Sequence, residues 1–195
     1  MLGKPVGHTL ATSMRPELVF KAYDVRGRTD NGDLDADLYR LVGSGLVDLL
    51  DAPVIAIGRD CRPTSKAFLN AMADGVTTAG ADVVDLGEVP TDAVYYYSGA
   101  AAVPGAIITA SHNPPVYNGI KLCKAGAAPI GADTGLAEIR VHVEGGDALV
   151  ADVAGKVTTI DIVGDYVDHL FSIVDASRIG ALRVAVDGGN GMAGI

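Results

Sequence analysis

A serine, a histidine and an asparagine stand together in Thr109–Pro115 (TASHNPP), directly after the apolar run Gly105–Ile108. An uncharged run of small and β-branched residues is typical of a buried strand, and the paired prolines require a loop after it. We therefore expect Ser111, His112 and Asn113 just beyond the carboxyl end of a strand, where open α/β sheets collect their ligands. A turn without any chemical role is the commoner use of such residues, so the flanking segments decide between the two interpretations.

Phosphoryl transfer is the chemistry that this segment favours. A serine hydroxyl is a weak nucleophile by itself, but a serine that carries a phosphate can pass it on if the developing charge is stabilised. Lys121 follows in the segment YNGIKL, one hairpin-like reversal of the chain after Ser111. It is a candidate cation for the phosphoryl oxygens, or a candidate acid or base. Acyl transfer lacks support, because no G-x-S-x-G elbow surrounds the serine and no partner acid is evident.

Two further segments lie upstream of the serine, Phe20–Gly27 (FKAYDVRG) and Gly58–Arg62 (GRDCR). Together with TASHNPPVYNGIK, they resemble the motifs of the α-D-phosphohexomutase family, in its phosphomannomutase/phosphoglucomutase branch. The three separated motifs occur in the order that the family has, and the resemblance covers residues 17–195. A start of the AYDxRG type, in place of GTDGxRG, disfavours the branch that acts on glucosamine.

This resemblance implies a reversible transfer of phosphate between C1 and C6 of mannose or glucose phosphate. It implies a phosphoserine and a hexose 1,6-bisphosphate that serves as intermediate and activator. It also implies Mg²⁺, with the phosphate on Ser111 as the only metal contact in this chain, since the family's aspartate-rich metal loop belongs to its second half. The alternatives are a non-catalytic domain fragment and a phosphoserine-dependent phosphatase, which would have to admit water to the site.

The motif match also implies roles for individual residues. It assigns Ser111, His112 and Lys121 to catalysis, and Tyr23, Arg26, Arg59 and Asn113 to substrate binding. An arginine can direct two donors at one phosphate, which suits Arg26. Adjacent side chains on an extended segment point in opposite directions, so His112 is expected to orient the loop and not to take the serine proton.

Several neighbouring residues are expected to have structural roles. Asp24 is interpreted as a local partner of an arginine. Arg59 and Arg62 could hold either the loop or the phosphate, and the loop is the favoured interpretation. The remaining histidines have no companions at ligand spacing and are expected to be structural or exposed, as is the tyrosine run in a helix; these residues are His8, His142 and His169, and Tyr95–Tyr97.

The net charge of −9 argues against nucleic acid and anionic membranes as partners. The family resemblance implies a small phosphosugar, an anion that this net charge does not favour. Nine of the 15 Lys and Arg residues precede position 67, and Lys121 and Lys124 flank the serine loop. Residues 133–175 are strongly acidic by contrast. We therefore expect a local basic cleft on an acidic body.

The compartment is expected to be the cytoplasm. No apolar stretch approaches the ~20 residues of a membrane span, and the first 16 residues lack the apolar segment of a secretory signal. Cys61 and Cys123 are the only cysteines, too few to suggest a disulfide framework, and both are expected to be reduced.

Alternating helical and extended patterns predict a sheet covered on both faces, and the family resemblance implies a three-layer α/β/α sandwich with a mixed, mostly parallel sheet. In 35–50 the apolar residues recur at spacings of three and four, and Asp33 or Asp35 could cap that helix. Thr64 or Ser65 could cap the next one. The predicted helices span 35–50, 65–79, 91–97 and 161–174, and the predicted strands span 54–57, 81–86, 105–109 and 182–186.

Changes of pattern divide the chain into four expected segments. These are a disordered leader (1–16), the domain with the active serine (17–160), a linker helix (161–177) and the first strand of a truncated second domain (178–195). Gly189–Gly194 fits the G-x-G-x-x-G pattern of dinucleotide sites, but neither a following helix nor an acidic residue about 20 positions on supports it. We therefore predict no dinucleotide.

Overall fold

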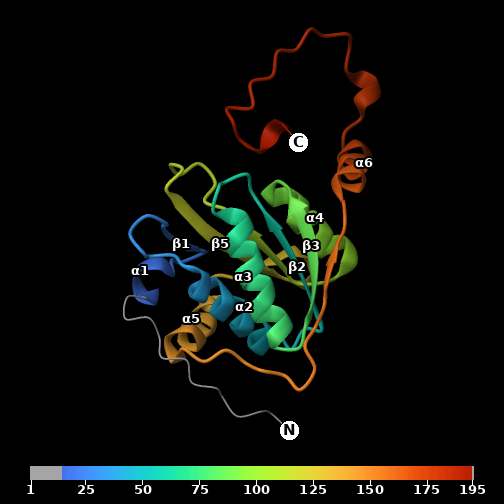
Figure 1. Cartoon of the computed structure of the whole chain (residues 1–195). Helices are drawn as coiled ribbons and strands as arrows, with labels where there is room; N and C mark the ends of the chain where they lie inside the picture. Colours follow the sequence, from blue (N-terminus) through green and yellow to red (C-terminus); the bar gives the residue numbers. More distant parts are fainter. Residues whose placement is uncertain (1–14, 195) are drawn as a thin grey trace.

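A seven-stranded sheet runs through the computed structural model, which describes residues 15–194 (Figure 1). Its strands lie in the order β1-β5-β4-β2-β3-β7, and the short β6 pairs with β5. The strands are β1 (Val25–Arg28), β2 (Val54–Arg59), β3 (Asp82–Glu88), β4 (Gly105–Ile108), β5 (Tyr117–Lys124), β6 (Ala128–Pro129) and β7 (Val157–Thr159).

All but one of these strands run in the same direction. β2 pairs in parallel with both β3 and β4, and β7 pairs in parallel with β3. β5 is antiparallel to β1, β4 and β6, so β5 alone is reversed. The sheet is therefore mixed and mostly parallel, which confirms the predicted fold class. The reversal from β4 to β5 also confirms the hairpin-like return that brings Lys121 back toward the serine loop.

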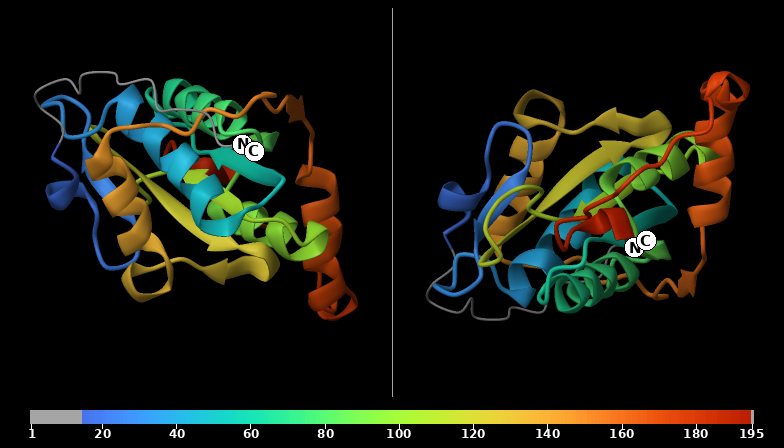
Figure 2. Two further views of the ribbon diagram at one scale, coloured as in Figure 1. Left: turned by 90° about the horizontal axis from the view of Figure 1, so that it is seen from below. Right: turned by 90° about the horizontal axis from the view of Figure 1, so that it is seen from above.

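Helices cover both faces of this sheet, as Figure 1 and Figure 2 show. Alternate residues of β2 reach opposite cores, because side chains of a strand alternate between its faces. Ile55 and Ile57 join one core, and Ala56 joins the other. The first core lies under α1 (Pro16–Val19), α2 (Ala36–Leu50), α3 (Ser65–Thr78) and α5 (Leu136–Gly145), and the second lies under α4 (Thr91–Ala101) and α6 (Val163–Ile173).

Helices α2 and α3 differ in whether a side chain caps their N-terminus. Asp35 caps α2 as predicted, since its carboxylate accepts a hydrogen bond from the backbone N–H of Leu38 at 2.8 Å. Thr64 occupies the corresponding position before α3, but its hydroxyl makes no cap bond. That hydroxyl accepts instead from the side-chain amide of Asn118 at 2.8 Å. The cap predicted for α3 is therefore wrong, because a distant strand occupies the side chain that would make it.

Two elements escaped prediction within the acidic stretch after residue 133. Helix α5 buries only three side chains, Leu136, Ile139 and Val143, and the apolar Val141 is exposed on its surface. Strand β7 is a three-residue edge strand whose residues are all exposed. Neither leaves a strong apolar period in the sequence. Helix α4 also continues to Ala101, four residues beyond its predicted end.

The predicted strand at 182–186 is not formed. These residues have no regular structure, and Leu182, Val184 and Val186 are exposed. An isolated extended segment has no ladder partner to satisfy its backbone, and no described segment pairs with this one. The helix predicted at 161–174 is present as α6, with Phe171 and Ile173 exposed on its surface.

Residues 1–14 of the expected leader, with His8, lie outside the described residues, and Pro16 begins α1. Among residues 15–194, no helix is long and apolar enough to cross a membrane. Cys61 is exposed, Cys123 is buried, and both are free thiols. Burial raises the pKa of the Cys123 thiol above its ordinary value, which keeps that sulfur protonated near neutral pH.

Candidate active site

Ser111 lies at the carboxyl edge of the sheet, three residues after the end of β4. The parallel register pairs Ile108 at the end of β4 with Arg59 at the end of β2, so the serine and GRDCR segments reach the same edge, as predicted. Ser111 is exposed, and its backbone has a φ of 53°. A non-glycine residue in this left-handed region costs about 1–3 kcal/mol, so the contacts around it must hold the turn.

His112 contacts the serine directly. Its ring Nδ1 lies 3.5 Å from Ser111 Oγ, at the outer limit of a hydrogen bond. The expectation that the two side chains point apart is wrong, because it assumed an extended segment and the positive φ of Ser111 turns the chain here. The imidazole is therefore within reach of the serine oxygen.

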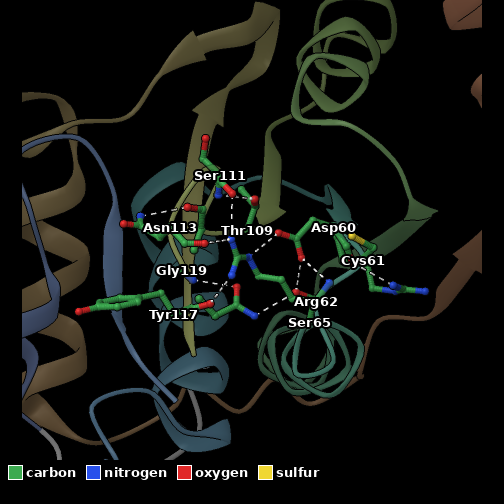
Figure 3. A network of polar contacts seen from close by, with 12 residues as sticks. Asp60, Cys61, Arg62, Ser65, Thr109, Ser111, Asn113, Tyr117 and Gly119 are labelled. Atoms are coloured by element: carbon green, nitrogen blue, oxygen red, sulfur yellow. Dashed lines mark hydrogen bonds and ion pairs between the residues drawn. The ribbon is translucent and has the colours of Figure 1, made fainter. Parts of the chain in front are cut away.

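Arg62 stands at the centre of the serine loop (Figure 3). Its Nε–H donates to a carboxylate oxygen of Asp60 at 3.0 Å. Its four remaining N–H groups, two on each terminal nitrogen, match four carbonyl oxygens of the loop at 2.7–3.0 Å, those of Ser111, Asn113, Pro114 and Tyr117. Arg62 thus holds the loop, which agrees with the favoured interpretation of this arginine.

Three buried polar side chains support Arg62 from below the loop. Asp60 accepts from the backbone N–H of Arg62 at 3.0 Å and from the hydroxyl of Ser65 at 2.5 Å. Asn118 donates to Ser65 Oγ at 2.9 Å and accepts from the backbone N–H of Gly119 at 2.8 Å. Sequence reasoning assigned no role to Asn118, which it noted only as part of the YNGIKL segment.

Gly119 is required where β5 passes between β1 and β4. A Cβ at this position would lie 2.2 Å from the carbonyl oxygen of Val25. The phenol of the buried Tyr39 donates to the Gly119 carbonyl at 3.3 Å. Burial holds the pKa of Tyr39 well above its ordinary value, so the phenol stays protonated as a donor. The strand that carries Lys121 is therefore fixed from both sides.

Asp24 brings two cations together beside the serine loop. Its carboxylate lies 2.6 Å from a terminal nitrogen of Arg26 and 3.4 Å from Lys121 Nζ. The other terminal nitrogen of Arg26 donates to the carbonyl of Ala110 at 3.1 Å, and Arg26 Nε is buried with no hydrogen-bond partner among residues 15–194. Arg26 therefore contacts the residue that precedes Ser111, Lys121 shares its carboxylate partner, and Asp24 has the role predicted for it.

The other substrate-binding candidates have different surroundings. Arg59 lies 2.5 Å from a carboxylate oxygen of Glu88 and donates to the Asp60 carbonyl at 3.0 Å. The amide of Asn113 donates to the Ala110 carbonyl at 3.0 Å and so bonds within the loop. Tyr23 is 81% exposed. Of these three, only Tyr23 presents its polar end to solvent without a hydrogen bond to a described residue.

The comparisons with known proteins agree with this geometry. Residues 17–149 match the family model described as phosphoglucomutase/phosphomannomutase, alpha/beta/alpha domain I. The chain belongs to the phosphoglucomutase/phosphomannomutase family. It is 35% identical to a phosphomannomutase of Vibrio cholerae over 187 residues, or 93% of this chain. It is 40% identical to one of Salmonella montevideo over 178 residues, or 90% of this chain.

A solved structure of this family is similar as well. The phosphoglucomutase/phosphomannomutase family protein of Burkholderia thailandensis superimposes with a TM-score of 0.69 and 30% identity, over 82% of this chain and 36% of that one. The chain spans 39–40% of the length of the two curated relatives. The family model covers the serine loop and all three motifs, so these comparisons concern the part of the family that carries them.

The basic cleft expected from the distribution of charge along the chain is only partly present. Arg26, Arg59, Arg62 and Lys121 gather at the serine edge, but each of them pairs with a carboxylate. Lys124 does not flank the loop in space. It lines a shallow pocket beside Val54 and Pro104, where β2 and β4 begin, at the opposite edge of the sheet. The reversed direction of β5 carries its last residue away from the serine.

The described residues do not make up a magnesium site. No three His, Cys, Asp or Glu side chains among residues 15–194 are grouped as metal ligands. The carboxylates of Asp24 and Asp60 are already paired with Arg26, Lys121 and Arg62. Mg²⁺ requires an octahedral shell of oxygen ligands, and the hydroxyl of Ser111 supplies one.

Proposed function

We propose that this chain is the phosphoserine-bearing part of a phosphohexomutase. The reaction is the reversible transfer of phosphate between C1 and C6 of mannose or glucose phosphate, with hexose 1,6-bisphosphate as the intermediate. The observation that carries the proposal is the exposed Ser111 on a left-handed turn, within reach of His112 and beside the paired cations Arg26 and Lys121. Membership of the family, whose model spans the serine motif, supports it.

The proposed chemistry assigns each group a step. A hydroxyl oxygen of the sugar attacks the phosphorus on Ser111 in line, and the P–Oγ bond breaks. The proton of the attacking hydroxyl reaches the serine oxygen by way of His112. Arg26 and Lys121 stabilise the charge on the phosphoryl oxygens. The bisphosphate then turns around, and its other phosphate returns to Ser111.

Tyr23, Arg26, Arg59 and Asn113 are the proposed substrate contacts. An exposed aromatic ring such as Tyr23 can pack against one face of a sugar. Arg59 and Asn113 would each have to release a protein partner, Glu88 or the Ala110 carbonyl, to reach a substrate. These two therefore differ from Tyr23, whose exposed ring can bind without such a rearrangement.

The family resemblance supports further proposals about the whole protein. They are a domain at 17–160, a linker at 161–177, the beginning of a second domain at 178–195, and a cytoplasmic location. Mg²⁺ would bind the phosphate on Ser111 and supply charge stabilisation, with its protein ligands outside the described residues.

The test is an assay of the natural protein that contains this chain. Mannose 1-phosphate and glucose 1-phosphate are each supplied with Mg²⁺ and a trace of glucose 1,6-bisphosphate, and ³¹P NMR follows the appearance of the 6-phosphate. We expect conversion of at least one substrate. Release of inorganic phosphate without isomerisation would favour a phosphatase, and no change of either substrate would contradict the proposed function.

A substitution at Arg26 tests the proposed role of the cation pair. A lysine in its place would keep the charge but could not bond to Asp24 and to the Ala110 carbonyl at once, as Arg26 does at 2.6 and 3.1 Å. A charge-assisted hydrogen bond is worth about 1.5–3 kcal/mol. We therefore expect Arg26→Lys to lower kcat/KM by roughly 10- to 100-fold, at about 1.36 kcal/mol per decade. Wild-type kinetics in this variant would make Arg26 a packing residue.

A further inference from the structure

We propose that Arg62 is a positioning residue for Ser111, which it holds in place through the backbone of the serine loop. This inference rests on the proposed function, in which Ser111 carries the phosphate. The guanidinium donates to the carbonyl oxygen of Ser111 at 2.8 Å, and its other donors are engaged elsewhere in the loop and by Asp60. Arg62 thus acts on the reacting atom only through the turn that presents it (Figure 3).

The geometry requires a guanidinium at this position. The four carbonyls that Arg62 binds belong to residues on both sides of the Pro114–Pro115 pair, and together with Asp60 they use all five of its N–H groups. A lysine ammonium has three donors around one nitrogen and cannot span this set. The side chain of Arg62 is only 10% exposed, so its guanidinium is largely shielded from water in the folded loop.

The anchor of Arg62 is fixed to the same strand that precedes the serine. The backbone N–H of Asp60 donates to the carbonyl of Ile108, the last residue of β4, at 2.9 Å. The carboxylate of Asp60, 9% exposed, binds both the side chain and the backbone of Arg62. Asp60 therefore ties the guanidinium to the end of β4, and the guanidinium sets how the loop leaves that strand.

This arrangement accounts for the left-handed turn at Ser111. The carbonyl of Ser111 is held inward by Arg62, while its backbone N–H donates to the hydroxyl of Thr109 at 3.0 Å. With both backbone groups fixed in this way, the chain reverses at a φ of 53° and the side chain is left exposed. Because Asp60 balances the charge of Arg62, the arginine positions the backbone of the loop and adds no unpaired charge to the site.

Hydrogen exchange in the 195-residue chain tests the positioning role without any assay of activity. The backbone N–H groups of Asn113 and Tyr117 are bonded within the loop, to Ala110 and Pro114, and report its order. In Arg62→Lys we expect these two amides to exchange about tenfold faster or more, with the amides of α2 unchanged. Arg40→Lys, which alters an exposed arginine paired with Asp37 and Asp74, is the matched control and should leave the loop unchanged.

Chemical rescue separates a local role from general loss of stability. Arg62→Ala leaves a space beside Asp60 that guanidinium ion can fill, so millimolar guanidinium should restore protection at Asn113 and Tyr117, whereas ammonium at equal ionic strength should not. Unchanged loop exchange in Arg62→Lys would overturn the proposal. Equal acceleration in α2 together with no rescue would also overturn it, because Arg62 would then only stabilise the fold.

In the natural protein the same variants give a kinetic result. A misplaced nucleophile loses rate more than affinity, so Arg62→Lys should lower kcat by about 10- to 100-fold, with KM changed by less than about threefold. Guanidinium should restore part of the kcat of Arg62→Ala. A loss confined to KM would make Arg62 a substrate contact and contradict the positioning role. If the wild-type protein isomerises neither sugar, the proposed function fails, and the exchange experiment still decides whether Arg62 orders the loop.

Discussion

Ser111→Ala is expected to remove the phosphate from the natural protein and to lower its turnover by more than about 10³-fold. The reason is that Ser111 has the exposed hydroxyl, which His112 contacts at 3.5 Å, whereas the other hydroxyl of Thr109–Pro115, that of Thr109, is buried. Intact-protein mass spectrometry should find one phosphate on the wild type and none on the variant. Fragmentation should place that phosphate on Ser111.

A second serine provides the control. Ser177 is also exposed, but its hydroxyl binds Asp175 in the segment after α6, far along the chain from the loop. Ser177→Ala should keep both the phosphate and the turnover of the wild type. A phosphate that persists in Ser111→Ala, or wild-type turnover in that variant, would show that another residue is the carrier.

Some elements could be predicted because their signals are local, but β1 and β5, which carry Arg26 and Lys121, were not among the predicted strands. Helix α2 has a regular apolar face and a capping Asp35, and β4 is an uninterrupted apolar run between turn residues. Helix α5 gave a much weaker signal, since three buried side chains suffice where α2 already covers most of the core. The segment 182–186 has the pattern of a strand and yet forms none, because a strand needs a partner as well as a pattern.

Some residues of the site could be predicted from the sequence, and others could not. Motifs placed Ser111, Lys121 and Arg26 near one another, and the strand register brings them together as expected. The contact between His112 and Ser111 depends on the positive φ of Ser111. Serine rarely adopts a positive φ, so the residue type gave no reason to predict this turn. The full role of Arg62 depends on its bonds to four backbone carbonyl groups. Every residue has a backbone carbonyl, so the sequence cannot indicate which ones an arginine will bind.

The structure shows that the cations of the site are paired with carboxylates, which a count of charged residues in the sequence could not reveal. The count of basic residues before position 67 suggested free positive charge, but Arg59, Arg62 and Lys121 each meet a carboxylate in the fold. Among the described residues of this edge, the cations that could bind a phosphate are therefore already paired. Phosphate binding would need either rearranged pairs or cations from outside the described residues.

Because of that charge balance, the 195-residue chain by itself should not isomerise hexose phosphates at a measurable rate. The described residues offer no grouped metal ligands, and the chain spans 39–40% of the length of its curated relatives. A metal ion and further cations each stabilise the transferring phosphoryl group by several kcal/mol. Their loss should reduce turnover by more than about 10⁴-fold relative to the natural protein, at about 1.36 kcal/mol per decade.

The measurement compares the purified 195-residue chain with its Ser111→Ala variant, in the presence of Mg²⁺, glucose 1-phosphate and a trace of glucose 1,6-bisphosphate. The two should be indistinguishable by ³¹P NMR, because any residual conversion then comes from host enzymes and not from Ser111. The natural protein, assayed in parallel, shows that the conditions support turnover. Conversion by the wild-type chain above that of its Ser111→Ala variant would mean that residues 1–195 contain a complete phosphoryl-transfer site. In that case Asp24 or Asp60, which pair with cations in this structure, would have to exchange those partners for a metal ion during the reaction.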